Sequence, residues 1–234
     1  MSSRSPARLL ALLIALVGAG VAAQTTDSAL RPVVGYFACY QAQFRSVPIR
    51  IVRTRDVFGT RSVSVGQPLS VCSPATVGGR RGSDSRTHLT CNSVAATPLA
   101  PRQWRVTSMF GTLAASVVAP SAYCAPSSAA KGGVLSAVPT TIDSYTCYSI
   151  KAAFPSPKKV SVADEFGTST DTVTAAASVC IRASTSLLSG ALACYSLDST
   201  MAARSVIVAS KFGLLKGSLG ARTQVCVRSL VRSA

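Results

Sequence analysis

The sequence predicts an all-β protein built from four tandem, disulfide-stapled β-repeats of about 40–50 residues each, grouped as two pairs. Three observations predict this fold class. Eight cysteines fall into four pairs of nearly constant separation, a Phe-Gly dipeptide recurs at a fixed place between them, and the residues around that dipeptide alternate between apolar and polar. Alternation with a period of two is typical of strands that bury one face.

Cysteine spacing defines the expected units. Paired in order along the chain, the cysteines lie 33, 33, 33 and 32 residues apart within a pair, and 19, 23 and 14 residues apart between pairs. The constant separation marks the inside of a unit, and the variable separation marks the connections. We expect each unit to be closed by its own disulfide, although spacing alone leaves bridges between units open. The candidates are Cys39, Cys72, Cys91, Cys124, Cys147, Cys180, Cys194 and Cys226.

A disulfide has a physical task in a unit of this size. About 40 residues bury too little apolar surface to hold themselves together. Closing a loop of about 33 residues adds about 3–4 kcal/mol of stability in the chain-entropy model, less any strain.

The Phe-Gly dipeptide lies 14 residues before the closing cysteine of every unit. In the first unit it ends the expected turn Asp56-Val57-Phe58-Gly59, where Asp can bond its own backbone and Gly tolerates positive φ. We expect the phenylalanines to anchor the core rather than to bind a ligand, because aromatic side chains dominate core burial. The predicted core positions are Phe58, Gly59, Phe110, Gly111, Phe166, Gly167, Phe212 and Gly213.

Each unit is expected to hold four short strands. In the first unit Val52 and Thr54 precede the turn with a polar residue between them, and a second alternating run follows it. The segment Gly66-Gln67-Pro68 is expected to break that run, before a short last strand that ends at Cys72.

The start of the chain and its longest connection set the expected boundaries. Residues 1–23 combine arginines, a short apolar core and small residues at the end, which is typical of a secretory signal peptide. An extension of residues 24–35 follows, and units one and two occupy residues 36–127. Residues 128–142, rich in Ala, Ser, Gly and Pro, are expected to be a flexible linker before units three and four in residues 143–230.

Cysteine content and the signal peptide together predict the location. An even number of cysteines behind a signal peptide indicates disulfides in an oxidising compartment. We expect a secreted protein, extracellular, on the cell surface or in a periplasm, with no transmembrane segment after cleavage.

The order of motifs resembles a known family. Leu-x-Cys-Tyr, Asp-x-Phe-Gly-Thr and Pro-x-x-x-Cys-x-Pro are similar to a tandemly repeated, cysteine-paired domain of secreted bacterial proteins whose function is uncharacterised. The joint DSRTHLTCN, residues 84–92, is similar to the segment that joins paired copies there, with Asn92 in place of the usual Tyr. Pro68 and Pro120 keep the pattern before the closing cysteine, and Ala176 and Arg222 depart from it. The resemblance implies no catalytic residue.

The sequence offers little acid–base or metal chemistry. His88 is the only histidine, and one histidine cannot form the usual zinc site. The cysteines lack the Cys-x-x-Cys spacing of thiolate metal sites. We therefore predict no catalytic residue, no metal site and no cofactor, and do not expect an enzyme. The alternative is a secreted hydrolase with a carboxylate site built between repeats, for which Asp164, Glu165 and Asp171 are the candidates.

Charge favours a binding role. The chain carries a net charge of +16 at pH 7, and +14 remains once Arg4 and Arg8 leave with the predicted signal peptide. A surface this basic favours acidic partners. Arg53, Arg55 and Arg61 flank the first turn and are the possible anion-binding residues, with a solvated strand face as the alternative.

Together these features predict a secreted, non-catalytic structural or adhesive module. It would present a basic β surface to an acidic polysaccharide, another envelope component or a partner protein. Nucleic acid is not an expected partner, because Trp104 is the only Trp and few aromatic side chains are available for base stacking.

Overall fold

The computed structural model describes residues 35–82, 84, 86–132, 134–140, 142–184, 190–199 and 204–234, all within the unit Arg31–Ala234. The described residues form 14 strands and no helix, which confirms the predicted all-β class. The predicted signal peptide, residues 1–23, and residues 24–34 of the predicted extension lie outside the described residues. The strands are β1 (Tyr36–Phe44), β2 (Arg50–Asp56), β3 (Gly59–Pro74), β4 (Thr76–Val77), β5 (Arg80–Arg81), β6 (His88–Ala95), β7 (Arg102–Ser108), β8 (Gly111–Ala130), β9 (Tyr145–Ala152), β10 (Lys158–Asp164), β11 (Gly167–Arg182), β12 (Ala191–Asp198), β13 (Arg204–Ser210) and β14 (Gly213–Ser233).

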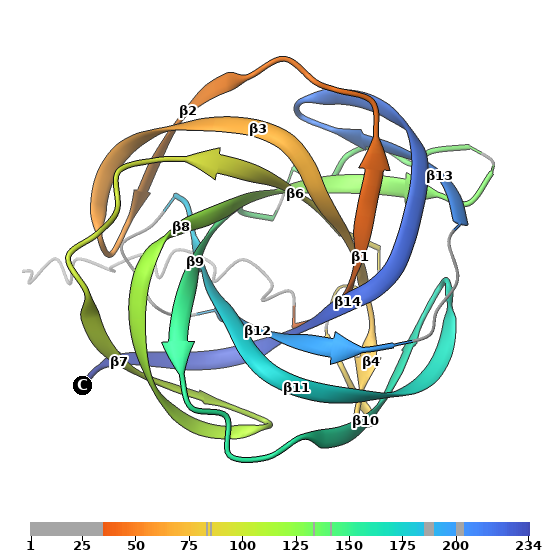
Figure 1. Ribbon diagram of the computed structural model, residues 1–234. Coiled ribbons are helices and arrows are strands. Elements are labelled where there is room, and N and C mark those ends of the chain that lie inside the picture. The colour runs from red at the N-terminus through yellow and green to blue at the C-terminus, as the bar shows by residue number, and fades with distance from the viewer. Residues whose placement is uncertain are drawn as a thin grey trace, which may run out of the picture. The chain divides into compact units, whose positions relative to one another are not determined.

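Eight of these strands form a closed sheet, seen along its axis in Figure 1. The order is β1, β3, β6, β8, β9, β11, β12 and β14, and β14 pairs again with β1. All neighbours are antiparallel. The two halves of the chain therefore share one sheet, joined by β8 with β9 and by β14 with β1. Of the predicted linker, residues 128–130 continue β8 and pair with β13, and the side chain of Ile142 is buried.

The four disulfides are Cys39–Cys72, Cys91–Cys124, Cys147–Cys180 and Cys194–Cys226. These are the bonds expected from the spacing. Each joins two half-cystines that lie directly opposite one another on neighbouring strands of the closed sheet. The stretches between bonded cysteines, residues 39–72, 91–124, 147–180 and 194–226, are called segments one to four below. Four disulfides and no free cysteine fit an oxidising environment.

A hairpin arm extends from each segment outside the closed sheet. The arms consist of β2, β7, β10 and β13, each paired through a two-residue turn with the first half of the long strand that follows. The turns have the expected chemistry. The N–H of Phe58 donates to Asp56 Oδ1 at 2.9 Å, and the N–H of Phe166 donates to Asp164 Oδ1 at 2.8 Å. Gly59 after the first turn has φ 105°, a conformation that favours glycine.

The prediction that a break separates the third and fourth strands of a unit is wrong. In segment one β3 runs without interruption from Gly59 to Pro74, and its register with β6 shifts on both sides of Pro68. Pro68 itself lies opposite Asn92, and the interrupted pairing on both sides of it suits a proline, which has no N–H to donate. Similar register shifts occur in β8 and β11. The bulge bends the long strand from its arm into the closed sheet without ending it.

The chain after each closing cysteine reaches the arm of the segment that lies two places away around the closed sheet. β4 pairs with β10, the end of β8 pairs with β13, and the end of β14 pairs with β7. In the fourth case the carbonyl of Ala183 accepts the N–H of Arg55 in β2 at 2.8 Å. These contacts cover strand edges that would otherwise be open. Because each arm depends on a distant segment, no segment could form this structure alone.

The described residues form three hydrophobic clusters, and the smallest of them contains Val63, Val65 and Tyr123. The inner core contains all eight half-cystines together with Phe37, Leu89, Tyr145 and Leu192. The largest cluster is the outer core, which lies between the sheet and the arms and includes Trp104. Of the predicted core phenylalanines, Phe110 and Phe166 are buried, whereas Phe58 and Phe212 are partly buried.

Candidate functional site

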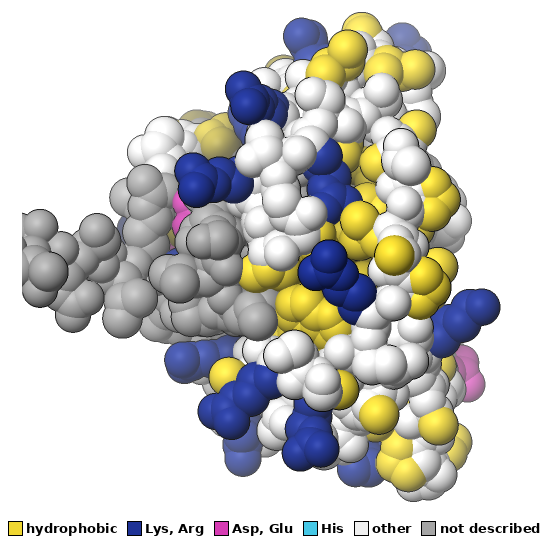
Figure 2. Space-filling view, turned by 90° about the vertical axis from the view of Figure 1, so that its left-hand side faces the viewer, with side chains coloured by type: hydrophobic (Ala, Val, Ile, Leu, Met, Phe, Trp, Pro, Cys, Tyr) yellow, Lys and Arg dark blue, Asp and Glu magenta, His cyan; other side chains and the backbone are white. Residues whose placement is uncertain are grey.

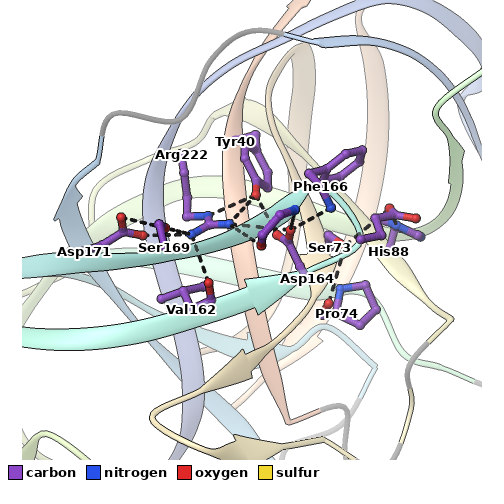
Figure 3. A network of polar contacts seen from close by, with 12 residues as sticks. Tyr40, Ser73, Pro74, His88, Val162, Asp164, Phe166, Ser169, Asp171 and Arg222 are labelled. Atoms are coloured by element: carbon purple, nitrogen blue, oxygen red, sulfur yellow. Dashed lines mark hydrogen bonds and ion pairs between the residues drawn. The ribbon is translucent and has the colours of Figure 1, made fainter.

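A buried ion-pair network connects segments one, three and four (Figure 3). Arg222 of β14 is fully buried, and its Nη1 donates to Asp171 Oδ2 at 2.9 Å and to Ser169 Oγ at 2.6 Å. Its Nε and Nη2 lie 3.0 and 2.7 Å from the hydroxyl oxygen of Tyr40. Asp164 Oδ1 lies 3.5 Å from Nη2, and Asp164 Oδ2 accepts the hydroxyl of Tyr40 at 2.7 Å. The guanidinium of Arg222 therefore forms ion pairs with two carboxylates.

The electrostatics of this network follow from its burial. Burial raises the pKa of Asp164 above its ordinary value, against the opposing effects of the Tyr40 hydrogen bond and the Arg222 charge. Burial and the neighbouring Asp164 also raise the pKa of Tyr40. The side chains of Asp164 and Asp171 are 0% and 2% exposed, so no substrate from solvent could contact these carboxylates. The structure thus places two of the three candidate hydrolase carboxylates in a buried ion pair.

The third candidate, Glu165, points away from the network toward His88. His88 Nε2 contacts Glu165 Oε1, and His88 Nδ1 lies 3.2 Å from the carbonyl oxygen of Arg86. Ser73 Oγ lies 3.4 Å from Glu165 Oε1. These side chains and Arg81 line a cavity of about 340 Å³. The His88–Glu165 contact joins the start of β6 to the β10–β11 turn, two elements that are far apart in the sequence.

The tyrosine that follows three of the four opening cysteines was not recognised as a polar anchor from the sequence. The hydroxyl of Tyr148 contacts Asp56 in the turn of segment one, and that of Tyr195 lies 2.7 Å from Ser108 Oγ in the turn of segment two. Tyr40 and Asp164 form the same contact between segments one and three. The turns of segments one, two and three therefore each dock on a tyrosine two segments away. The recurrence of Tyr after Cys and of Asp or Ser before Phe-Gly was the available signal.

These tyrosines predict an alkaline limit to stability. Burial raises the pKa of Tyr40, Tyr145, Tyr148 and Tyr195 above the ordinary value of about 10. Because the unfolded chain loses these protons first, their contribution to stability is complete below about pH 10 and is lost as the pH rises toward the raised values. We expect tyrosinate absorbance to appear together with loss of near-ultraviolet circular dichroism, whereas protein unfolded in urea should titrate near pH 10. Ionisation of these tyrosines in protein that stays folded would contradict the prediction.

The three predicted anion-binding arginines do not lie together. Arg53 and Arg55 are exposed on one face of β2. Arg61 pairs in register with Thr54, which places it on the opposite face of the hairpin. There its Nη2 donates to the carbonyl of Phe58 at 2.8 Å and lies 3.9 Å from Asp56 Oδ1. Arg53 and Arg55 line a surface hollow of about 390 Å³ with Ala183 and Ser184, so these two alone form the candidate anion site.

The outer surface is strongly cationic because several carboxylates form ion pairs with arginines of the protein itself and are not exposed. Asp56, Asp143, Asp164 and Asp171 lie within 4 Å of arginines. Among the described residues only Glu165 and Asp198 are exposed acids, and Glu165 is bound to His88. On the face shown in Figure 2, Lys and Arg side chains are spread over the surface and acidic ones are few. In the part of the chain that the structure describes, the exposed cations are Arg45, Arg50, Arg53, Arg55, Arg80, Arg81, Arg86, Arg102, Arg105, Lys131, Lys151, Lys159, Lys211, Lys216, Arg228 and Arg232.

Comparisons with protein-family models, with curated proteins and with solved structures found no match to this chain. Among the described residues, none forms a helix of the length and hydrophobicity that a membrane span requires. The described residues also contain no group of three or more His, Cys, Asp or Glu side chains arranged to hold a metal ion.

Proposed function

We propose that this chain is a secreted, non-catalytic binding protein whose cationic outer surface holds an acidic polymer of a cell envelope. The separation of charge carries the proposal: among the described residues 16 Lys and Arg side chains are exposed, while four of the seven carboxylates lie within 4 Å of arginines. Basic surfaces attract polyanions over long range. The closed, disulfide-linked sheet would keep the cations at fixed positions, which lowers the entropy lost on binding.

Arg53 and Arg55 are the expected centre of this surface. Their side chains project from the same face of β2 beside a hollow, and Arg50 and Arg45 precede them as further exposed cations. A guanidinium can bind sulfate or carboxylate with two parallel hydrogen bonds. The arrangement therefore supports recognition of a sulfated or carboxylated polysaccharide.

The test is titration of the folded protein with heparin as the polyanionic probe. We expect binding that weakens as salt is raised, and a loss of roughly tenfold in affinity, about 1.4 kcal/mol, for Arg53→Ala/Arg55→Ala. The matched control is Arg228→Ala/Arg232→Ala, which removes the same charge from exposed positions at the other end of the chain. An equal loss in both variants would show that only net charge matters. No binding of heparin at low salt would contradict the proposal.

The alternative function, a secreted hydrolase with a carboxylate site between repeats, has no supporting observation of this kind. Asp164 and Asp171 both belong to the hairpin of segment three, and they lie around Arg222 of segment four and away from solvent.

A further inference from the structure

The closed sheet contains a cavity of about 310 Å³ whose wall is lined by all four disulfides. The eight half-cystines form a continuous belt, since the sulfur atoms of neighbouring disulfides lie 3.5 to 3.9 Å apart all the way round. On one side of the belt, Phe37, Leu89, Tyr145 and Leu192 are at most 3% exposed and close the floor. On the other side Leu69, which is 47% exposed, stands at the mouth.

Small side chains keep this space unfilled. A closed sheet of eight strands is just wide enough either to be filled by inward side chains or to hold one small ligand. Here the belt positions carry half-cystines, each linked across to the next strand rather than extended toward the axis. The next lining positions toward the mouth carry Ser70, Ala122 and Ser178. The interior of this closed sheet is therefore not filled by side chains and has room for one small ligand.

The lining chemistry specifies the kind of ligand. The floor and belt are apolar, and none of the described residues that line the cavity has a charged side chain. Hydroxyl and amide groups gather toward the mouth, from Ser121, Ser149, Thr223 and Gln224 as well as the two serines above. A charged ligand would lose its hydration without gaining a partner of opposite charge, whereas a neutral apolar body with a polar end matches both regions.

We propose that this cavity is a binding site for a neutral, aromatic small molecule that carries a hydroxyl or carbonyl group at one end. Sulfur atoms make favourable contacts with aromatic ring edges, and the belt offers eight of them. A cavity of about 150 Å³ lined by apolar side chains accommodates benzene, so about twice that volume has room for two fused rings. The polar end of the ligand would lie at the mouth, within reach of the serine hydroxyls. This site is separate from the cationic outer surface, and it does not rest on the polyanion proposal.

Naphthol is the probe for this site, because it combines two fused aromatic rings with one hydroxyl. Calorimetric titration of the oxidised protein with naphthol should give one bound naphthol per chain. Saturating heparin should change neither this stoichiometry nor the affinity for naphthol. Ala122→Phe, which places a ring inside the cavity, should weaken binding by roughly tenfold or more. The matched control is Ala114→Phe on the same strand, where the alanine is exposed, and it should bind as the unmodified protein does.

A second measurement keeps the proposal testable if Ala122→Phe does not fold. In methyl NMR spectra of the unmodified protein, naphthol should shift the methyl signals of Leu89 and Leu192 on the floor and leave those of the exposed Leu214 unchanged. Shifts confined to exposed residues, equal binding by the two alanine variants, or no binding of naphthol would each overturn the proposal.

Discussion

Arg222→Ala is expected to destabilise the fold by about 3–5 kcal/mol, because it leaves two buried carboxylates without their cation. Asp164 and Asp171 have almost no exposed side-chain surface, so water cannot replace the guanidinium. The Tyr40 hydroxyl would also lose its two contacts with Arg222. Urea unfolding followed by circular dichroism measures the change. The control is Arg228→Ala on the same strand, an exposed position where we expect a change within about 0.5 kcal/mol.

The pH dependence identifies the cause of this loss. Burial already raises the pKa of Asp164 in the folded protein, and removal of Arg222 should raise it further. A carboxyl group with a raised folded pKa contributes stability below its unfolded pKa of about 4, and this contribution is lost as the pH rises through the folded value. The deficit of Arg222→Ala should therefore be smaller at about pH 4 than at about pH 7. An equal deficit at both values would mean that lost packing, rather than unpaired charge, is responsible.

The sequence was sufficient for what is local. Strand alternation, the Asp56-to-Gly59 turn and the constant cysteine spacing each depend on residues close together in the chain or on one repeated distance, and the structure agrees with them. It was insufficient for contacts between segments. Arg222 stood out only as a departure from the proline seen at Pro68 and Pro120. Its carboxylate partner Asp171 lies 51 residues away on another strand, and no local pattern relates the two.

In the candidate anion site, the position of each arginine along its strand decides on which face of the hairpin its side chain lies. Side chains two apart on a strand share a face, so Arg53 and Arg55 could be grouped from the sequence. The placement of Arg61 depends on the length of the turn between the strands, because a change of one residue moves every later side chain to the other face. With a two-residue turn Arg61 lies opposite Thr54 and faces Asp56. The interior cavity could not be predicted from the sequence either, because the inward positions of the eight strands become neighbours only when the sheet closes.

Replacing both Cys91 and Cys124 with alanine is expected to cost about 3–4 kcal/mol, because the unfolded chain regains the freedom of a 33-residue loop. The sulfur belt predicts a different result for Cys91→Ala alone. The remaining thiolate of Cys124 lies 3.5 Å from the sulfur of Cys147 and can attack it. The attack forms a Cys124–Cys147 bond and releases Cys180 as a thiolate, which in turn lies 3.7 Å from Cys194.

The free thiol of the single variant should therefore move round the belt. Rapid alkylation followed by peptide mapping without reduction should find label on Cys124 and also on Cys180, in proportions that change as the pH is raised and more thiolate forms. The double alanine variant is the control, since it has no thiol to start the exchange and should keep its three remaining bonds. Label on Cys124 alone at every pH would show that the strands hold neighbouring disulfides too rigidly to exchange. In that case the belt would be four independent staples, and its sulfur contacts would matter only for packing around the cavity.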